Sequence, residues 1–184
     1  MDDGWPAVPE DALETGGWEL VDRTAETVFR LSPAEVVGRT LLYEDPELRE
    51  RLGTSDVTRF FFATALSFRP SLPPGAAPLV EPTVRRQANT AFTDRLRDRG
   101  FEGISRRDRG EIDTASGARA SLSTVGARCE LDGRRLDVTG WLAVWRDDGF
   151  RLAGGAYPES GTDIESANSE TYREELLSLV KGVE

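Results

Sequence analysis

Two segments of the chain carry apolar side chains on both faces of a strand. Residues 58–68 and 134–147 both show this pattern. In the first, one face carries Phe60, Phe62, Leu66 and Phe68, and the other carries Phe61, Ala63 and Ala65. In the second, one face carries Leu136, Val138, Leu142 and Val144, and the other carries Trp141, Ala143 and Trp145. A strand with one face in solvent would alternate apolar and polar residues. Both segments are therefore predicted to lie in a sheet that is covered on both faces.

Further strands are predicted around these two from alternation and turn residues. Short strands are expected near 17–23, 25–31 and 35–43, and four strands are expected at about 101–113, 118–131, 134–147 and 150–157. The turns between the last four are marked by Ser116-Gly117, Asp132-Gly133 and Asp148-Gly149, which are hairpin signals. Because such short loops cannot join parallel strands, these four strands are predicted to form an antiparallel meander.

Three helices are predicted from their end signals and apolar spacing. A short helix over 46–52 is expected to be capped by Asp45, with Pro46 at its first position and Gly53 after its end. A second helix is expected from Pro82 to Arg99, after a loop over 69–82 that contains five prolines. A third is expected over 169–182, capped by Asn168 or Ser169. The two longer helices carry apolar stripes, namely Val84, Ala88, Ala91, Phe92 and Leu96, and Tyr172, Leu176, Leu179, Val180 and Val183.

The predicted fold class is α+β, with a central antiparallel sheet in a three-layer α/β/α sandwich. One amphipathic helix is available for each apolar face of the sheet. The length of 184 residues suits one domain. We expect a flexible N-terminal lead-in over 1–16, which is rich in Pro and Gly, and a single α+β domain over 17–184. A cystatin-like or lipocalin-remnant arrangement of the same elements remains an alternative.

The charged residues are unusual in kind. The net charge is −10, and Lys181 is the only lysine, so 22 of the 23 basic residues are arginines. Histidine is absent. This composition resembles that of acidic proteins from salt-in halophilic archaea, whose carboxylates keep the surface hydrated where salt screens charge within about 3 Å at 1 M. An ordinary acidic bacterial protein is the alternative. Such acidity disfavours binding to nucleic acid or to anionic membranes.

The end of the chain resembles that of a known fold family. The stretch FRLAGGAYPES over 150–160 leads into TYREELLSLVKGV over 171–183. This ending, together with the order of predicted elements, resembles PsbP-like proteins, and it is also similar to uncharacterised halophilic archaeal families with a Trp…Gly-Ala-Tyr-Pro ending. The resemblance implies the α/β/α sandwich and a binding or assembly role. It brings no catalytic residues to this chain.

Several kinds of chemistry lack the residues they need. Without histidine, no Ser-His-Asp or Cys-His arrangement can form, and Cys129 as the single cysteine cannot complete a zinc site. The usual glycine-rich phosphate motifs are absent, and Gly154-Gly155 is interpreted as a bulge or a place of close helix packing. No cofactor and no metal are therefore expected. A lack of leader features and of long apolar runs indicates a cytoplasmic protein that binds no membrane.

Arginines are the strongest candidates for a binding site. Arg85 and Arg86 lie on the second predicted helix, and Arg106, Arg107 and Arg109 follow in the next strand. Guanidinium groups fit carboxylates and phosphates, so the five residues are predicted to bind an anionic ligand or an acidic partner. Ordinary ion pairs with neighbouring Asp and Glu are the alternative.

The predicted function is a non-enzymatic binding or assembly module with a protein partner. Its expected surface is the proline-rich segment 69–82 with the adjoining Arg85 and Arg86. The sequence leaves open two alternatives. One is an enzyme that uses carboxylates, such as Glu111 and Asp113, with arginines on a small anionic or sugar substrate. The other is a homo-oligomer that pairs through an edge strand.

Overall fold

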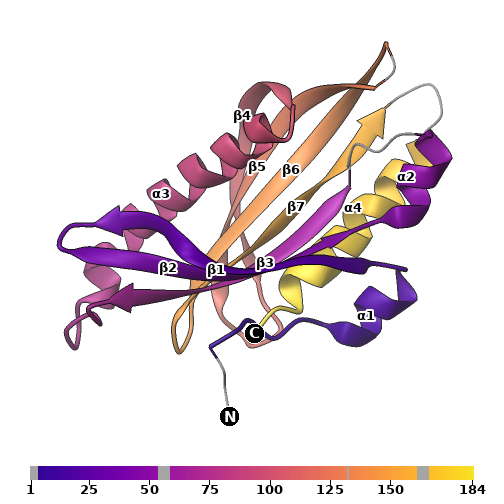
Figure 1. Cartoon of the computed structure of the whole chain (residues 1–184). Coiled ribbons are helices and arrows are strands. Elements are labelled where there is room, and N and C mark those ends of the chain that lie inside the picture. The colour runs from indigo at the N-terminus through magenta and orange to yellow at the C-terminus, as the bar shows by residue number, and fades with distance from the viewer. Residues whose placement is uncertain (1–3, 54–58, 132, 161–165) are drawn as a thin grey trace.

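A computed structural model of the chain describes residues 4–53, 59–131, 133–160 and 166–184. Within these residues, the protein is an α+β fold of one seven-stranded antiparallel sheet and four helices (Figure 1). The strands are β1 (Glu19–Leu31), β2 (Ala34–Glu44), β3 (Phe60–Arg69), β4 (Glu102–Asp113), β5 (Arg119–Leu131), β6 (Arg134–Arg146) and β7 (Phe150–Ser160). The helices are α1 (Glu10–Thr15), α2 (Pro46–Leu52), α3 (Ala77–Asp98) and α4 (Ser166–Lys181).

The sheet consists of two meanders that join at β3 and β7. Its strand order is β1-β2-β3-β7-β6-β5-β4, and every neighbouring pair is antiparallel. The predicted meander of the last four strands is confirmed. Strands β3 and β7 pair from Phe60 opposite Ala156 to Leu66 opposite Phe150. The two segments that are apolar on both faces, β3 and β6, are both interior strands.

The side chains on the two faces of the sheet form two separate apolar clusters. The α4-side cluster includes Phe61, Trp141, Trp145, Leu176 and Val180. The α3-side cluster includes Phe60, Val84, Phe92, Leu142 and Leu152. Each longer helix therefore buries its apolar stripe against a different cluster, and β5–β7 run between α3 and α4 in Figure 1.

One core residue packs on the face opposite to the predicted one. Leu136 was expected to share a face with Val138, but it belongs to the α4-side cluster. The register between β6 and β7 shifts between Asp137 and Val138, directly after this residue. A register irregularity interrupts the alternation from which the face was predicted.

The predicted short helix is confirmed in its details. The Asp45 side chain accepts a hydrogen bond from the Leu48 N–H at 3.1 Å, Pro46 is the first helical residue, and Gly53 ends α2 in the left-handed region with φ of 62°. Helix α4 begins at Ser166, so Asn168 and Ser169 do not cap it. The Ser169 hydroxyl instead donates to the carbonyl oxygens of Pro158 and Glu159.

The bounds of β1 and α3 differ from those predicted. Strand β1 is one strand of 13 residues rather than two, and it pairs with β2 without a break through Arg23, Thr24 and Ala25. Helix α3 begins at Ala77 rather than at Pro82. Pro78 lies in the first turn, where its missing N–H is not needed, and the helix continues through Pro82 while Val80 and Val84 pack on the α3-side cluster. The last six of the fourteen residues in the predicted proline-rich loop are therefore helical.

The described part of the segment before β1 contains the short helix α1. Its Leu13 is buried in the α4-side cluster. Ala7 and Glu184 exchange both backbone hydrogen bonds, at 2.8 and 3.0 Å. The sequence predicted no element here because six helical residues between Pro9 and Gly16 carry little apolar periodicity. The division into a lead-in and one domain stays a prediction.

Some predictions lie outside the described residues. These are the start of the strand at Thr58, the turn residue Asp132, and the part of the final linker over 161–165. Within the described part of the chain, no helix has the length and apolar content needed to cross a membrane.

Candidate functional site

An apolar groove lies between α3 and the inner faces of β1, β2 and β3. Its walls include Phe60 and Phe62 of β3 and Phe92 of α3, and Leu142 and Leu152 contribute from the central strands. The empty space between its walls, including the part open to solvent, is about 740 Å³.

Small residues on α3 leave this space unfilled. Val84, Ala88, Phe92 and Leu96 are the buried positions of the helix, and Ala88 and the half-buried Ala91 both line the groove. A methyl group at these two positions does not reach across to the strands opposite. The helical spacing that buries α3 therefore also produces a cavity beside its small side chains.

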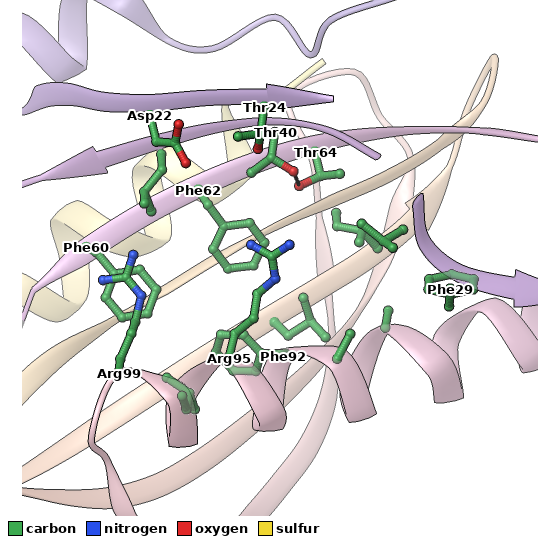
Figure 2. Close-up of a pocket in the computed structure, with 17 residues that line it drawn as sticks. Asp22, Thr24, Phe29, Thr40, Phe60, Phe62, Thr64, Phe92, Arg95 and Arg99 are labelled. Atoms are coloured by element: carbon green, nitrogen blue, oxygen red, sulfur yellow. Dashed lines mark hydrogen bonds between the residues drawn. The ribbon is translucent and has the colours of Figure 1, made fainter. Parts of the chain in front are cut away.

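Two threonines place hydroxyl groups inside the groove. The Oγ1 atoms of Thr40 on β2 and Thr64 on β3 are 2.8 Å apart and hydrogen bonded (Figure 2). These residues are directly opposite each other in the β2–β3 register. Each of these two hydroxyls is therefore the hydrogen-bond partner of the other, and Thr24 of β1 adds a third hydroxyl to the lining.

Three charged side chains line the groove from its two sides. Figure 2 shows Arg95 and Arg99 extending from the C-terminal end of α3 towards the strands, and Asp22 on the strand side opposite them. Arg95 donates to Glu26 of β1. Arg99 lies 4.5 Å above the Phe60 ring centre. These side chains connect the end of α3 to the first two strands across the groove.

The Arg99 guanidinium is held in partly apolar surroundings. Its side chain is 27% exposed, and its nearest carboxylate is that of Glu44, at 3.7 Å. Burial lowers the pKa of Arg99 below its ordinary value, and the Glu44 carboxylate opposes this effect without cancelling it. The positive charge of Arg99 is therefore stabilised less by its surroundings than the charge of an arginine in water.

The five arginines predicted from the sequence lie elsewhere. Arg85 donates to Glu81 at 2.6 Å, and Arg86 is exposed on α3. Arg106 and Arg109 are exposed on the edge strand β4. None of these residues, nor Arg107, is among those that line the groove. Their role in binding stays a prediction.

Arg107 extends across the sheet from the edge strand. It donates to Thr139 Oγ1 at 3.2 Å and to Glu159 at 2.9 Å. It passes over Gly126, where an added Cβ would lie 2.2 Å from its Nε atom. Burial raises the pKa of Glu159, but hydrogen bonds from Thr139 and Arg107 outweigh it, so the pKa is lowered overall. Arg107 thus has the ordinary ion pair that the sequence left open as an alternative.

The carboxylates considered for catalysis do not line the groove. Glu111 and Asp113 lie on β4 with side chains 66% and 79% exposed, and each is 3.7 Å from Arg119. Within the described parts of the chain, no three His, Cys, Asp or Glu side chains gather as a metal site. The arrangement at the groove can bind an apolar molecule, and it offers arginines rather than paired carboxylates.

Arg59, like Arg95 and Arg99, was not predicted as a site residue from the sequence. It is 4% exposed and lies between the rings of Trp18 and Tyr172, 4.4 and 4.3 Å from their centres. Its guanidinium donates to Asp45 at 2.5 Å and to Glu175. These contacts join β3, α2 and α4. No local signal distinguishes this arginine, because its partners are distant in the sequence.

The fold and the groove define an α+β protein with a helix-covered apolar site. The chain matches, over residues 5–184, the model of a family described as "Domain of unknown function (DUF6517)". The protein belongs to this family. Among curated proteins, none matches the chain.

Proposed function

We propose that the protein is a non-enzymatic binding module, and that its site is the apolar groove between α3 and strands β1–β3. The observation that carries this proposal is an unfilled space lined by Phe60, Phe62 and Phe92 in an otherwise packed core. Ligand sites are characteristically concave and apolar, with a few polar groups at defined places. The ligand is a small apolar molecule rather than a protein segment.

The lining of the groove favours a ligand with a hydrocarbon chain. Three phenylalanine rings, those of Phe60, Phe62 and Phe92, make up much of its apolar wall. A single hydrocarbon chain would contact both Phe62 and Phe92 along its length. The paired hydroxyls of Thr40 and Thr64 require no polar group from the ligand.

A chain-length series of straight alkan-1-ols tests the proposed function. Binding measured by calorimetry at constant salt should strengthen by about fourfold for each added CH₂, as about 0.8 kcal/mol of burial per CH₂ implies, until the groove is full. Ala91→Phe should abolish binding, because the new ring occupies the groove. The control Thr90→Phe adds the same ring at the neighbouring exposed position and should leave binding unchanged. Absence of binding across the series would contradict the proposal.

A homo-oligomer is a second candidate function, favoured by one observation. The edge strand β1 exposes Leu20 and Val21, which are 47% and 42% exposed. Exposed apolar residues on an edge strand favour pairing with another strand. Sedimentation in molar KCl would decide this, since a monomer at all concentrations contradicts it. The proline-rich segment 69–82 with Arg85 and Arg86 remains the proposed surface for a protein partner.

We further propose that the protein works in a salt-rich cytoplasm and has the three-layer, PsbP-like arrangement. The excess of ten negative charges and the nearly complete use of Arg for Lys support the first part. The two clusters, each with its own helix, support the second. The same acidity argues against nucleic acid as a partner.

A further inference from the structure

We propose that the ligand of the groove is a single-chain carboxylate, whose carboxyl group binds Arg99 and whose hydrocarbon chain lies among Phe60, Phe62 and Phe92. This inference rests on the proposed function and specifies its ligand class. Three features of the groove support it: the position of Arg99, the pairing of the other charges, and the apolar interior.

Arg99 lies where the head group of a ligand would be if the ligand's hydrocarbon chain occupied the apolar part of the groove. The two arginines of the lining are four residues apart at the C-terminal end of α3, with Arg95 in its last turn and Arg99 directly after Asp98. The Arg99 guanidinium lies over the Phe60 ring, and Figure 2 shows the Arg99 and Phe60 side chains next to each other. A ligand that contacts the ring with its chain therefore brings its first atoms to the guanidinium.

Arg99 has the more distant carboxylate partner of the two arginines. Arg95 is hydrogen bonded to Glu26, whereas Arg99 and Glu44 form an ion pair at 3.7 Å. A carboxylate would accept two parallel N–H bonds from the planar guanidinium. Because the Arg99 side chain is only 27% exposed, those bonds would be less weakened by solvent than bonds at an open surface.

The surrounding acids distinguish between possible head groups. Asp22 lines the groove and Glu44 is close to Arg99, so a head group with two negative charges would be repelled more strongly than a head group with one. A cationic head would instead be repelled by both arginines of the lining. A carboxylate with a single negative charge is the head group that this arrangement accepts best.

Four ligands with the same chain and different head groups test the inference. Decanoate, decyl phosphate, decan-1-ol and decyltrimethylammonium are titrated into the protein by calorimetry, at one ionic strength and below their aggregation concentrations. Decanoate should bind about tenfold more tightly than decan-1-ol, as expected for charge-assisted hydrogen bonds. Decyl phosphate should bind less tightly than decanoate, and the ammonium compound should bind least.

Three variants locate the effect. Arg99→Gln should abolish the preference for decanoate over decan-1-ol, and Arg99→Lys should retain part of it. Arg97→Gln is the matched control, because Arg97 lies two residues before Arg99 in the last turn of α3, is 60% exposed and pairs with Asp94. It should change neither ligand.

The outcomes separate the inference from the proposed function. Three results would contradict a carboxylate ligand and leave the groove as an apolar site. These are equal binding of decanoate and decan-1-ol, tighter binding of the phosphate or the ammonium compound, and an unchanged preference in Arg99→Gln. Failure of all four ligands to bind would overturn both.

Discussion

At the scale of single residues, Arg59 contributes to the fold through charge in an apolar environment. A buried charge is tolerated only when it is paired. Arg59 meets this condition with two carboxylates and two aromatic rings. Asp45 has two functions, since one oxygen caps α2 at Leu48 and the other accepts from Arg59. Arg59, directly before β3, therefore fixes the start of this strand relative to both α2 and α4.

Replacement of Arg59 by methionine should destabilise the protein strongly. The apolar side chain can still pack between Trp18 and Tyr172, but Asp45 is left buried without its cation. Removing one partner of a buried pair costs about 3–5 kcal/mol. Denaturant unfolding at constant salt would measure the change in the free energy of unfolding.

Glu175→Gln is the control for this substitution. The Glu175 side chain is 42% exposed, so the loss of its charge should cost about 1 kcal/mol or less. A loss in the Arg59 variant no larger than that in the Glu175 variant would show that the pair with Asp45 is not the important contact.

At the scale of elements, strand β7 approaches its neighbours at a pair of glycines. A Cβ added at Gly155 would lie 2.0 Å from the Phe60 carbonyl oxygen and 3.0 Å from a methyl carbon of Leu176. One at Gly154 would lie 2.0 Å from the Trp141 carbonyl oxygen. The predicted close helix packing is thus present at Gly155, and close approach of the neighbouring strands adds to it.

Gly155→Ala should be among the more damaging single substitutions in this protein. The neighbouring backbone cannot move away as a flexible side chain can, so β3 and β7 must separate. We expect a loss of more than about 3 kcal/mol, in the upper range for point substitutions.

Gly110→Ala provides the comparison, because Gly110 is also in a strand but nothing lies within 4 Å of an added Cβ. This variant should unfold at nearly the same denaturant concentration as the wild type. Similar losses in the two variants would refute the explanation by close approach.

The elements differ in how well the sequence predicts them, for physical reasons. Strands β5, β6 and β7 combine apolar strand segments with short turns, and both signals are local. Strand β1 was divided at Thr24, although it pairs with β2 on both sides of this residue. The groove could not be predicted, because it forms where the small residues Ala88 and Ala91 face strands distant in the sequence. Arg95 and Arg99 resemble any charged residues at the end of a helix until the strands opposite are known.

At the scale of the whole molecule, the net charge of −10 opposes the compact state. Salt has two effects, since it weakens exposed attractive pairs such as Arg30–Glu35 and also screens the excess of like charges. Exposed pairs contribute little each. The relief of repulsion should therefore be the larger effect, and salt should stabilise the protein.

The melting temperature is expected to rise between about 0.1 M and 2 M KCl, where screening shortens to a few ångströms. A variant with Asp147→Asn and Asp148→Asn carries two fewer negative charges at exposed positions and preserves a good turn sequence before Gly149. Its melting temperature should depend less on salt. A melting temperature of the wild type that does not change over this range would contradict the salt adaptation.

The separation of the two apolar clusters has a consequence for spectroscopy. Trp18, Trp141 and Trp145 belong to the α4-side cluster, as do Tyr157 and Tyr172, and Tyr43 packs against it. Trp5 lies instead beneath Arg23. The aromatic residues of the α3-side cluster are all phenylalanines. The tryptophan and tyrosine fluorescence of this protein therefore originates away from the groove, so loosening of α3 could escape a fluorescence melt that reports an intact fold.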